Sequence, residues 1–136
     1  RRNYTGMSLS EEERNALVTL QMEKARTFLQ QADEMYVLKY WDIASNRYYY
    51  ACFHAVQALL IKHGLTCRTH DGLIGCFGLN FIKTGIISSH LGSFLSRIEQ
   101  LRQKGDYNCL YSISEEEISA MRAPARELVE KIKELI

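Results

Sequence analysis

The sequence predicts an all-α fold, an up-and-down bundle of four to five helices. Apolar residues recur at steps of three and four along several segments, which is the period of an amphipathic helix. No segment shows the strict alternation of apolar and polar residues that marks a half-buried strand. With 136 residues, 46% of them hydrophobic, and a single proline, the chain can form one compact core but is too small for two.

The first predicted helix begins after Ser10, because Ser10 and Glu13 have the Ser-x-x-Glu spacing of a capping box. We expect this helix to end near Tyr36. Its buried face is predicted to be a mostly apolar stripe made of Leu17, Leu20, Lys24, Phe28, Gln31 and Met35.

The second predicted helix opens at Trp41 or Asp42 and ends at a C-cap formed by Gly64. It is apolar around nearly its whole circumference. Small side chains recur along it, at Ala44, Ala51, Ala55 and Ala58. Because small residues let neighbouring helices approach closely, we expect this helix to be central and buried.

A less regular region follows. Glycines punctuate residues 65–85, and only a short helix over residues 71–77 is expected there. The next helix is predicted to open at Ser88 or Ser89 and to stop at Gly105.

The last helix is predicted after a loop over residues 106–113. Ser114 and Glu117 repeat the spacing of a capping box. Apolar residues then recur helically to the end of the chain. Pro124 falls inside this helix, where we expect it to cause a kink.

Charge and segment lengths limit the classes of partner and compartment. Lysine and arginine number 17 against 16 acidic residues, a formal net charge of +1, so a basic surface must be a local patch. The most apolar stretch, residues 51–61, is too short to span a bilayer.

Residues 1–9 are predicted to be a flexible segment, or residues added before a natural start at Met7, and residues 10–136 a single domain. The segment carries no secretory signal and the cysteines form no Cys-x-x-Cys pair, which favours a reducing cytoplasm.

The clearest constellation of polar residues lies on the second helix. Arg47, Tyr50 and His54 are spaced so that they share one face. A charged arginine on an apolar helix needs a partner. The partner is either an anionic ligand or a buried polar network, for which Asp33, Asp42 and Asp106 are the available carboxylates.

Two other segments carry candidate ligand-binding residues. Arg102, Asp106 and Tyr107 follow one another around a helix end, where the cation could equally be a capping charge. Arg68 and His70 flank Thr69, which can cap a short helix, and phosphate binds at such helix starts.

Metal and nucleotide-hydrolase sites are not expected. Cys67 and His70 have a spacing that metal ligands use, but no second pair accompanies them. No phosphate-binding loop, dinucleotide fingerprint, nucleophile elbow or zinc-protease helix occurs. We therefore expect neither a metal nor a cofactor.

Four ordered motifs give a resemblance to a known family. They are the segments 47–55, 69–72, 81–85 and 102–107, and with them nearly the whole chain resembles a HEPN domain. The resemblance implies a helical bundle, usually a homodimer in bacterial or archaeal cytoplasm, often encoded beside a minimal nucleotidyltransferase. It also implies nucleotide or RNA as ligand, and Tyr107 as a candidate acceptor of a nucleotidyl group.

Some HEPN proteins are metal-independent ribonucleases that act as toxins, and their motif is an arginine followed after four to six residues by a histidine. In this chain Tyr107 stands where that histidine would follow Arg102. Our leading hypothesis is a module that binds nucleotide or RNA and acts with a nucleotidyltransferase in a toxin–antitoxin or defence-type system. The alternatives are a ribonuclease, with His54 as base and Arg102 or Arg47 as the stabilising cation, and a structural dimerisation module without a ligand.

Overall fold

The protein is seen in a computed structural model that describes residues 9–136. The expectations for residues 1–9, including the start at Met7, therefore fall almost entirely outside the described residues. The elements are α1 (Glu11–Val37), α2 (Trp41–Lys62), α3 (His70–Phe77), the π-helical turn η2 (Gly78–Ile82), α4 (Ser89–Tyr107) and α5 (Glu115–Leu135). The described part contains no strand, which confirms the predicted all-α bundle.

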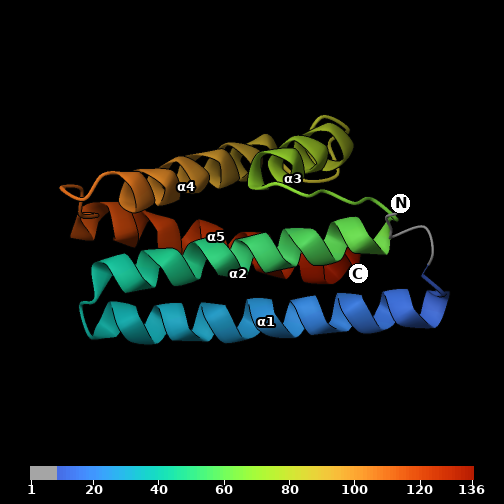
Figure 1. The fold of residues 1–136 in the computed structure, drawn as a ribbon, viewed down its shortest axis with the longest axis horizontal. Coiled ribbons are helices and arrows are strands. Elements are labelled where there is room, and N and C mark those ends of the chain that lie inside the picture. The colour runs from blue at the N-terminus through green and yellow to red at the C-terminus, as the bar shows by residue number, and fades with distance from the viewer. Residues whose placement is uncertain (1–8) are drawn as a thin grey trace.

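Helix α2 occupies the centre of the bundle. Helices α1 and α2 run antiparallel as a hairpin, α3 and α4 lie along the other side of α2, and α5 lies behind it (Figure 1). Ten side chains of α2 are buried, among them the four alanines that the sequence singled out. The prediction of a central helix with close neighbours is thus confirmed.

The predicted helix starts are confirmed by their caps. The amide of Glu13 donates to the Ser10 hydroxyl at 3.0 Å, and the Ser10 amide donates to the Glu13 carboxylate at 2.8 Å. Ser114 and Glu117 repeat both bonds at the start of α5. These caps fix where α1 and α5 begin.

The predicted buried face of α1 is only partly correct, because Phe28 and Met35 pack half-buried against the core but Lys24 is exposed. The buried residues are Val18, Ala25, Leu29 and Ala32, whereas Leu20 is 46% exposed. Alanines at 25 and 32 fit closely against the small residues of α2, and this close approach turns the larger stripe toward the edges of the contact. The spacing predicted a stripe of mostly larger residues, whereas two of the four fully buried positions are alanines.

Two other boundaries differ from the prediction. Helix α4 continues through Gly105 to Tyr107, and the segment after α3 forms η2 instead of irregular chain. Gly64 has the left-handed conformation, with φ of 73°, and lies just beyond α2. Pro124 lies within α5. None of the helices in the described part is long and apolar enough to cross a membrane.

Candidate functional site

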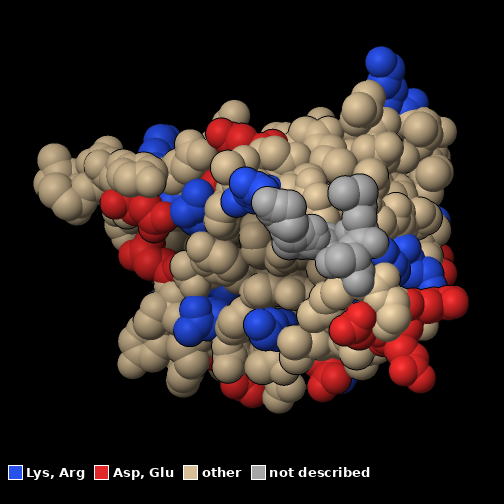
Figure 2. Space-filling view, turned by 45° about the vertical axis from the view of Figure 1, so that its right-hand side comes forward, with Lys and Arg blue, Asp and Glu red and all other residues tan. Residues whose placement is uncertain are grey.

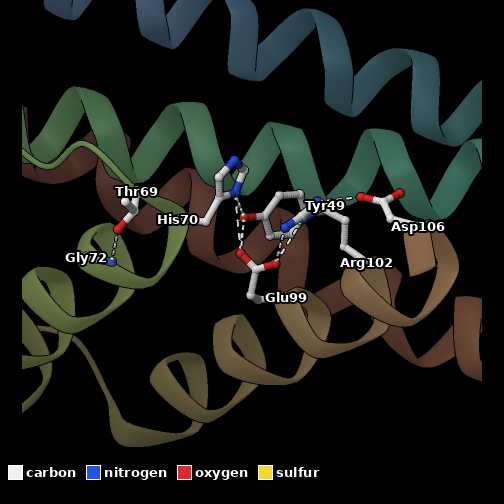
Figure 3. Close-up of polar contacts among 7 residues, drawn as sticks. All are labelled: Tyr49, Thr69, His70, Gly72, Glu99, Arg102 and Asp106. Atoms are coloured by element: carbon white, nitrogen blue, oxygen red, sulfur yellow. Dashed lines mark hydrogen bonds and ion pairs between the residues drawn. The ribbon is translucent and has the colours of Figure 1, made fainter. Parts of the chain in front are cut away.

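A single buried carboxylate joins three helices. Glu99 of α4 is 3% exposed. It accepts a hydrogen bond from the Tyr49 hydroxyl of α2 at 2.8 Å and lies 3.3 Å from Nδ1 of His70, the first residue of α3. Arg102, one turn further along α4, donates to it through Nε at 2.9 Å and through a terminal nitrogen at 2.7 Å (Figure 3). Such bonding compensates the cost of burying the charge of Glu99.

Two members of this cluster, Tyr49 and Arg102, have raised pKa values that keep them protonated. Burial and the hydrogen bond to Glu99 raise the pKa of Tyr49, so its phenol remains protonated and donates. Burial opposes the charge of Arg102, but Glu99 outweighs this effect and raises the pKa of the guanidinium. Arg102 also binds Asp106 at 2.6 Å. Two carboxylates therefore neutralise one guanidinium.

His70 is oriented by the start of α3. The Thr69 hydroxyl accepts a hydrogen bond from the Gly72 amide at 2.8 Å and caps the helix, as the sequence predicted. The imidazole stacks on Phe53 with ring centres 4.5 Å apart, and Nδ1 contacts the Tyr49 oxygen. Because Tyr49 donates to Glu99, the network is satisfied when Nδ1 of His70 carries the hydrogen. Nε2 then keeps its lone pair.

The predicted face of α2 meets α1. The Arg47 guanidinium donates to the Gln31 side chain at 3.0 Å and to the Asn46 side chain at 2.6 Å, and it lies 5.4 Å from the centre of the Phe28 ring. The His54 ring lies 5.3 Å from Phe28. Arg47 and His54 thus come together around one aromatic side chain of α1.

His54 is neutral at physiological pH. Its Nδ1 lies 2.6 Å from the Gln21 side-chain oxygen. Burial, with a smaller contribution from the charge of Lys24, lowers its pKa to about 4. Since an amide oxygen only accepts, Nδ1 of His54 donates and Nε2 is left as an acceptor.

The carboxylates named as partners for Arg47 bind elsewhere, so the predicted buried network is wrong in its members. Asp33 accepts from Tyr48 and pairs with two arginines of α5. Asp42 binds the segment before α5, and Asp106 pairs with Arg102. The sequence could not distinguish these partners because their separation along the chain says nothing about which helix faces lie opposite.

Aromatic rings connect the two sets of residues. Tyr50 lies 6.4 Å from His54 and 6.1 Å from His70, measured between ring centres. Phe53 contacts both histidines. The rings form a continuous path from Phe28 on α1 to the Glu99 cluster. The aromatic–basic face is our name for the rings of this path together with the cations that lie beside it. The rings are those of Phe28, Tyr50, Phe53, His54 and His70, and the cations already described are Arg47 and Arg102.

In the space-filling view, lysine and arginine side chains lie on both sides of a hollow whose visible floor is uncharged (Figure 2). Acidic side chains lie mainly toward the margins. With a net charge of +1, the basic surface of an anion site must be a local grouping of cations.

The other predicted site residues lie around this face. Arg68 is exposed in the segment before α3, and Tyr107 is 84% exposed at the end of α4. A cavity of about 270 Å³ lies between α2 and α4, lined by Asn46, Arg102 and Asp106 among others. Because Asn46 also binds Arg47, this cavity adjoins both sets of residues.

A larger cavity of about 650 Å³ lies between α1 and α5, and it is lined by none of the predicted site residues. The volume of a cavity alone therefore does not locate the site. The candidate site is the one where the polar side chains converge. Within residues 9–136 no group of three or more metal-ligating side chains converges.

Two central residues were missed from the sequence. Glu99 lies on the buried face of α4, in line with Leu91, Leu95 and Arg102 at steps of three and four. A carboxylate in an apolar stripe, three residues before an arginine, is a recognisable signal of a buried ion pair. Tyr49 gave no such signal, because tyrosines flank it on both sides.

The chain was also compared with known proteins. Residues 18–135 match the HEPN domain family. A UPF0332 protein of Thermotoga maritima is 32% identical over 124 residues, which cover 91% of this chain and 94% of the relative. Two proteins of Methanocaldococcus jannaschii, each named "putative toxin", are 33% and 31% identical. The first alignment covers 85% of both chains, and the second covers 71% of this chain and 65% of the relative.

Proposed function

Because the chain belongs to the HEPN domain family, we propose that it is a toxin-type HEPN module that binds RNA or nucleotide and acts with a partner nucleotidyltransferase. The observation that carries the proposal is the aromatic–basic face. Rings offer stacking surfaces to bases, and cations beside them attract phosphates, which is the usual construction of a single-strand binding surface. The names of the two Methanocaldococcus relatives support a role in a toxin–antitoxin or defence-type system.

The partnership centres on Tyr107. Its ring is 84% exposed and follows directly after Asp106, which pairs with Arg102. A phenol so exposed is accessible to another protein. In the proposed step the Tyr107 oxygen attacks the α-phosphorus of ATP bound by the nucleotidyltransferase, pyrophosphate leaves, and the phenol proton passes to solvent. The product would block access to the neighbouring Arg102 cluster.

Three measurements test this function. The purified protein is titrated into a fluorescein-labelled oligoribonucleotide, and separately into the nucleotidyltransferase encoded beside it. We expect binding of both at micromolar concentration. Intact mass after incubation with that enzyme and ATP should rise by one nucleotidyl group in the wild type and stay constant in Tyr107→Phe. Absence of both RNA binding and partner binding would refute the proposal.

A metal-independent ribonuclease is the second candidate, and one observation favours it. The Glu99 cluster places a histidine, His70, beside Arg102 although none follows Arg102 along the helix. With Nδ1 held by Tyr49 and Glu99, Nε2 of His70 could take the proton of a ribose 2′-hydroxyl. The resulting oxygen would attack the adjacent phosphorus and expel the 5′-oxygen, which takes up a proton. His54, the base predicted from the sequence, faces α1 and contacts Gln21 instead.

The ribonuclease is tested with labelled RNA in the presence of a chelator. Cleavage that is lost in His70→Ala and retained in His54→Ala would assign His70 as the base, and the reverse would assign His54. Intact RNA with the wild type would exclude the activity. Light scattering tests the proposed homodimer, and a monomer that still binds RNA would exclude a purely structural dimerisation role.

A further inference from the structure

The cations of the aromatic–basic face differ in whether carboxylates neutralise them. Arg102 is bonded to Glu99 and to Asp106. Arg47 donates only to neutral amides, and within residues 9–136 neither Arg47 nor Lys24 forms an ion pair. An anion that binds Arg102 must displace or face two carboxylates, whereas Arg47 has no paired carboxylate to displace.

His54 and Lys24 complete the surroundings of Arg47. His54 shares Phe28 with Arg47. Lys24 is exposed on α1, three residues after Gln21 and four before Phe28, so helical spacing places it on the face of α1 that meets His54. Its charge also contributes to the lowered pKa of His54. Two uncompensated cations and a neutral imidazole therefore lie together. The imidazole has donated its Nδ1 hydrogen to Gln21, so its Nε2 can only accept.

This set of donors and acceptors suits one chemical unit. A phosphate supplies oxygens for a guanidinium and an ammonium, and a ribose hydroxyl supplies a hydrogen for an imidazole lone pair. The Tyr50 and Phe53 rings beside His54 offer a surface for a base. The ring path then continues to His70, which gives room for a neighbouring nucleotide.

We propose that Lys24, Arg47 and His54 form a ribonucleotide subsite of single-stranded RNA, with the phosphate on the two cations and the 2′-hydroxyl on Nε2 of His54. This inference rests on the proposed function, since it specifies how the aromatic–basic face holds RNA. It assigns the phosphate to α1 and α2, and it leaves Arg102 as a positioning residue that holds Glu99 and Asp106 in place.

The experiment measures binding of a short fluorescein-labelled oligouridylate by anisotropy at several salt concentrations. We expect Arg47→Gln and Lys24→Gln each to weaken binding by roughly tenfold. Each should also reduce the slope of log K against log salt by about 0.7, the value for one phosphate contact on a single strand. Arg26→Gln is the matched control, because Arg26 lies on α1 but lines the cavity that faces α5, and it should change affinity by less than about twofold.

A second arm tests the role of His54. His54→Asn retains a donor for Gln21 and lacks Nε2, so we expect the affinity for oligouridylate to fall to that for oligodeoxyuridylate, with the DNA affinity unchanged. Equal loss for RNA and DNA would overturn the hydroxyl contact. Uridine monophosphate that binds as tightly as the oligomer would overturn the assignment to polymeric RNA.

Failure of this inference is distinguishable from failure of the proposed function. If the wild type binds RNA but Lys24→Gln and Arg47→Gln bind equally well, the subsite is wrong and the function stands. If the wild type binds no RNA, the function itself fails. Lys24 is exposed, so Lys24→Gln keeps the test valid should Arg47→Gln fail to fold.

Discussion

Replacement of Glu99 by alanine should destabilise the protein strongly, because it removes the acceptor shared by three helices. Loss of one partner of a buried ion pair costs about 3 to 5 kcal/mol. In the variant, Arg102 still pairs with Asp106, and its side chain is 14% exposed. The cost of leaving Arg102 without Glu99 therefore lies at the lower end of this range, about 3 kcal/mol. The buried Tyr49 hydroxyl loses its acceptor, which adds about 1 kcal/mol. The predicted loss is therefore about 4 kcal/mol.

The assay is urea unfolding followed by circular dichroism, with thermal unfolding in parallel. A loss of this size should lower Tm by roughly 12 to 16 °C at about 3 to 4 °C per kcal/mol for a domain of this length. The matched control is Glu127→Ala. Glu127 pairs with His90 at 3.2 Å, but the two side chains are 53% and 61% exposed, so the change should stay within about 0.5 kcal/mol.

A double-mutant cycle refines the test. Once Arg102 is also replaced, no guanidinium remains to be paired, so Glu99→Ala with Arg102→Ala should cost clearly less than the two single changes added together. Equal destabilisation by Glu99→Ala and Glu127→Ala, or strict additivity in the cycle, would refute the view that Glu99 holds the cluster together.

Three further predictions concern pH, backbone and packing. The pKa of His54 is lowered from 6.5 to about 4 in the folded protein, so the unfolded chain takes up the proton first. The free energy of unfolding should therefore fall by about 2 to 3 kcal/mol as the pH drops from 6.5 to about 4. His54→Asn should abolish this part of the pH dependence in urea titrations. Gly64→Ala should cost about 1 to 2 kcal/mol because φ is 73° there. Gly75→Ala, inside α3 with open space around it, should instead stabilise by up to about 1 kcal/mol, and equal Tm shifts for the two would contradict the argument. Asp33→Ala should cost about 1 to 3 kcal/mol by removing the acceptor of the buried Tyr48 hydroxyl, and an unchanged urea midpoint would show that Asp33 does not support α1 against α5.

The elements that the sequence predicted well are those set by local chemistry. The caps at Ser10, Thr69 and Ser114 depend on residues three positions apart, so the sequence contains all the information they need. The central position of α2 followed from its composition alone. By contrast, the buried face of α1 depends on how closely two helices approach, and the preference for Ala25 and Ala32 appears only when α2 lies opposite.

The candidate site was predictable in its residue types but not in its pairings. Arg47, Tyr50 and His54 do lie together, because helical periodicity places them on one face. The role of Glu99 and the capture of His70 by α4 depend on contacts between positions far apart in the chain. The pairing of Glu99 with Arg102 leaves a periodic trace along α4, but the contacts of Glu99 with Tyr49 and His70 arise from the packing of helices and leave none.

The short length of α3 has a consequence for how the cluster is assembled. This helix spans only His70–Phe77 and contains two glycines, Gly72 and Gly75, which lower the intrinsic stability of a helix. Helix α2 has buried residues from Ala44 to Leu60, so we expect this part to open only when the whole domain unfolds. Amide hydrogens of α3 should therefore exchange long before those of α2. The contact between the His70 imidazole and the Glu99 carboxylate therefore forms and breaks as α3 folds and unfolds locally. A ligand that contacts this imidazole will slow the exchange of amide hydrogens in α3 and leave the exchange in α2 unchanged.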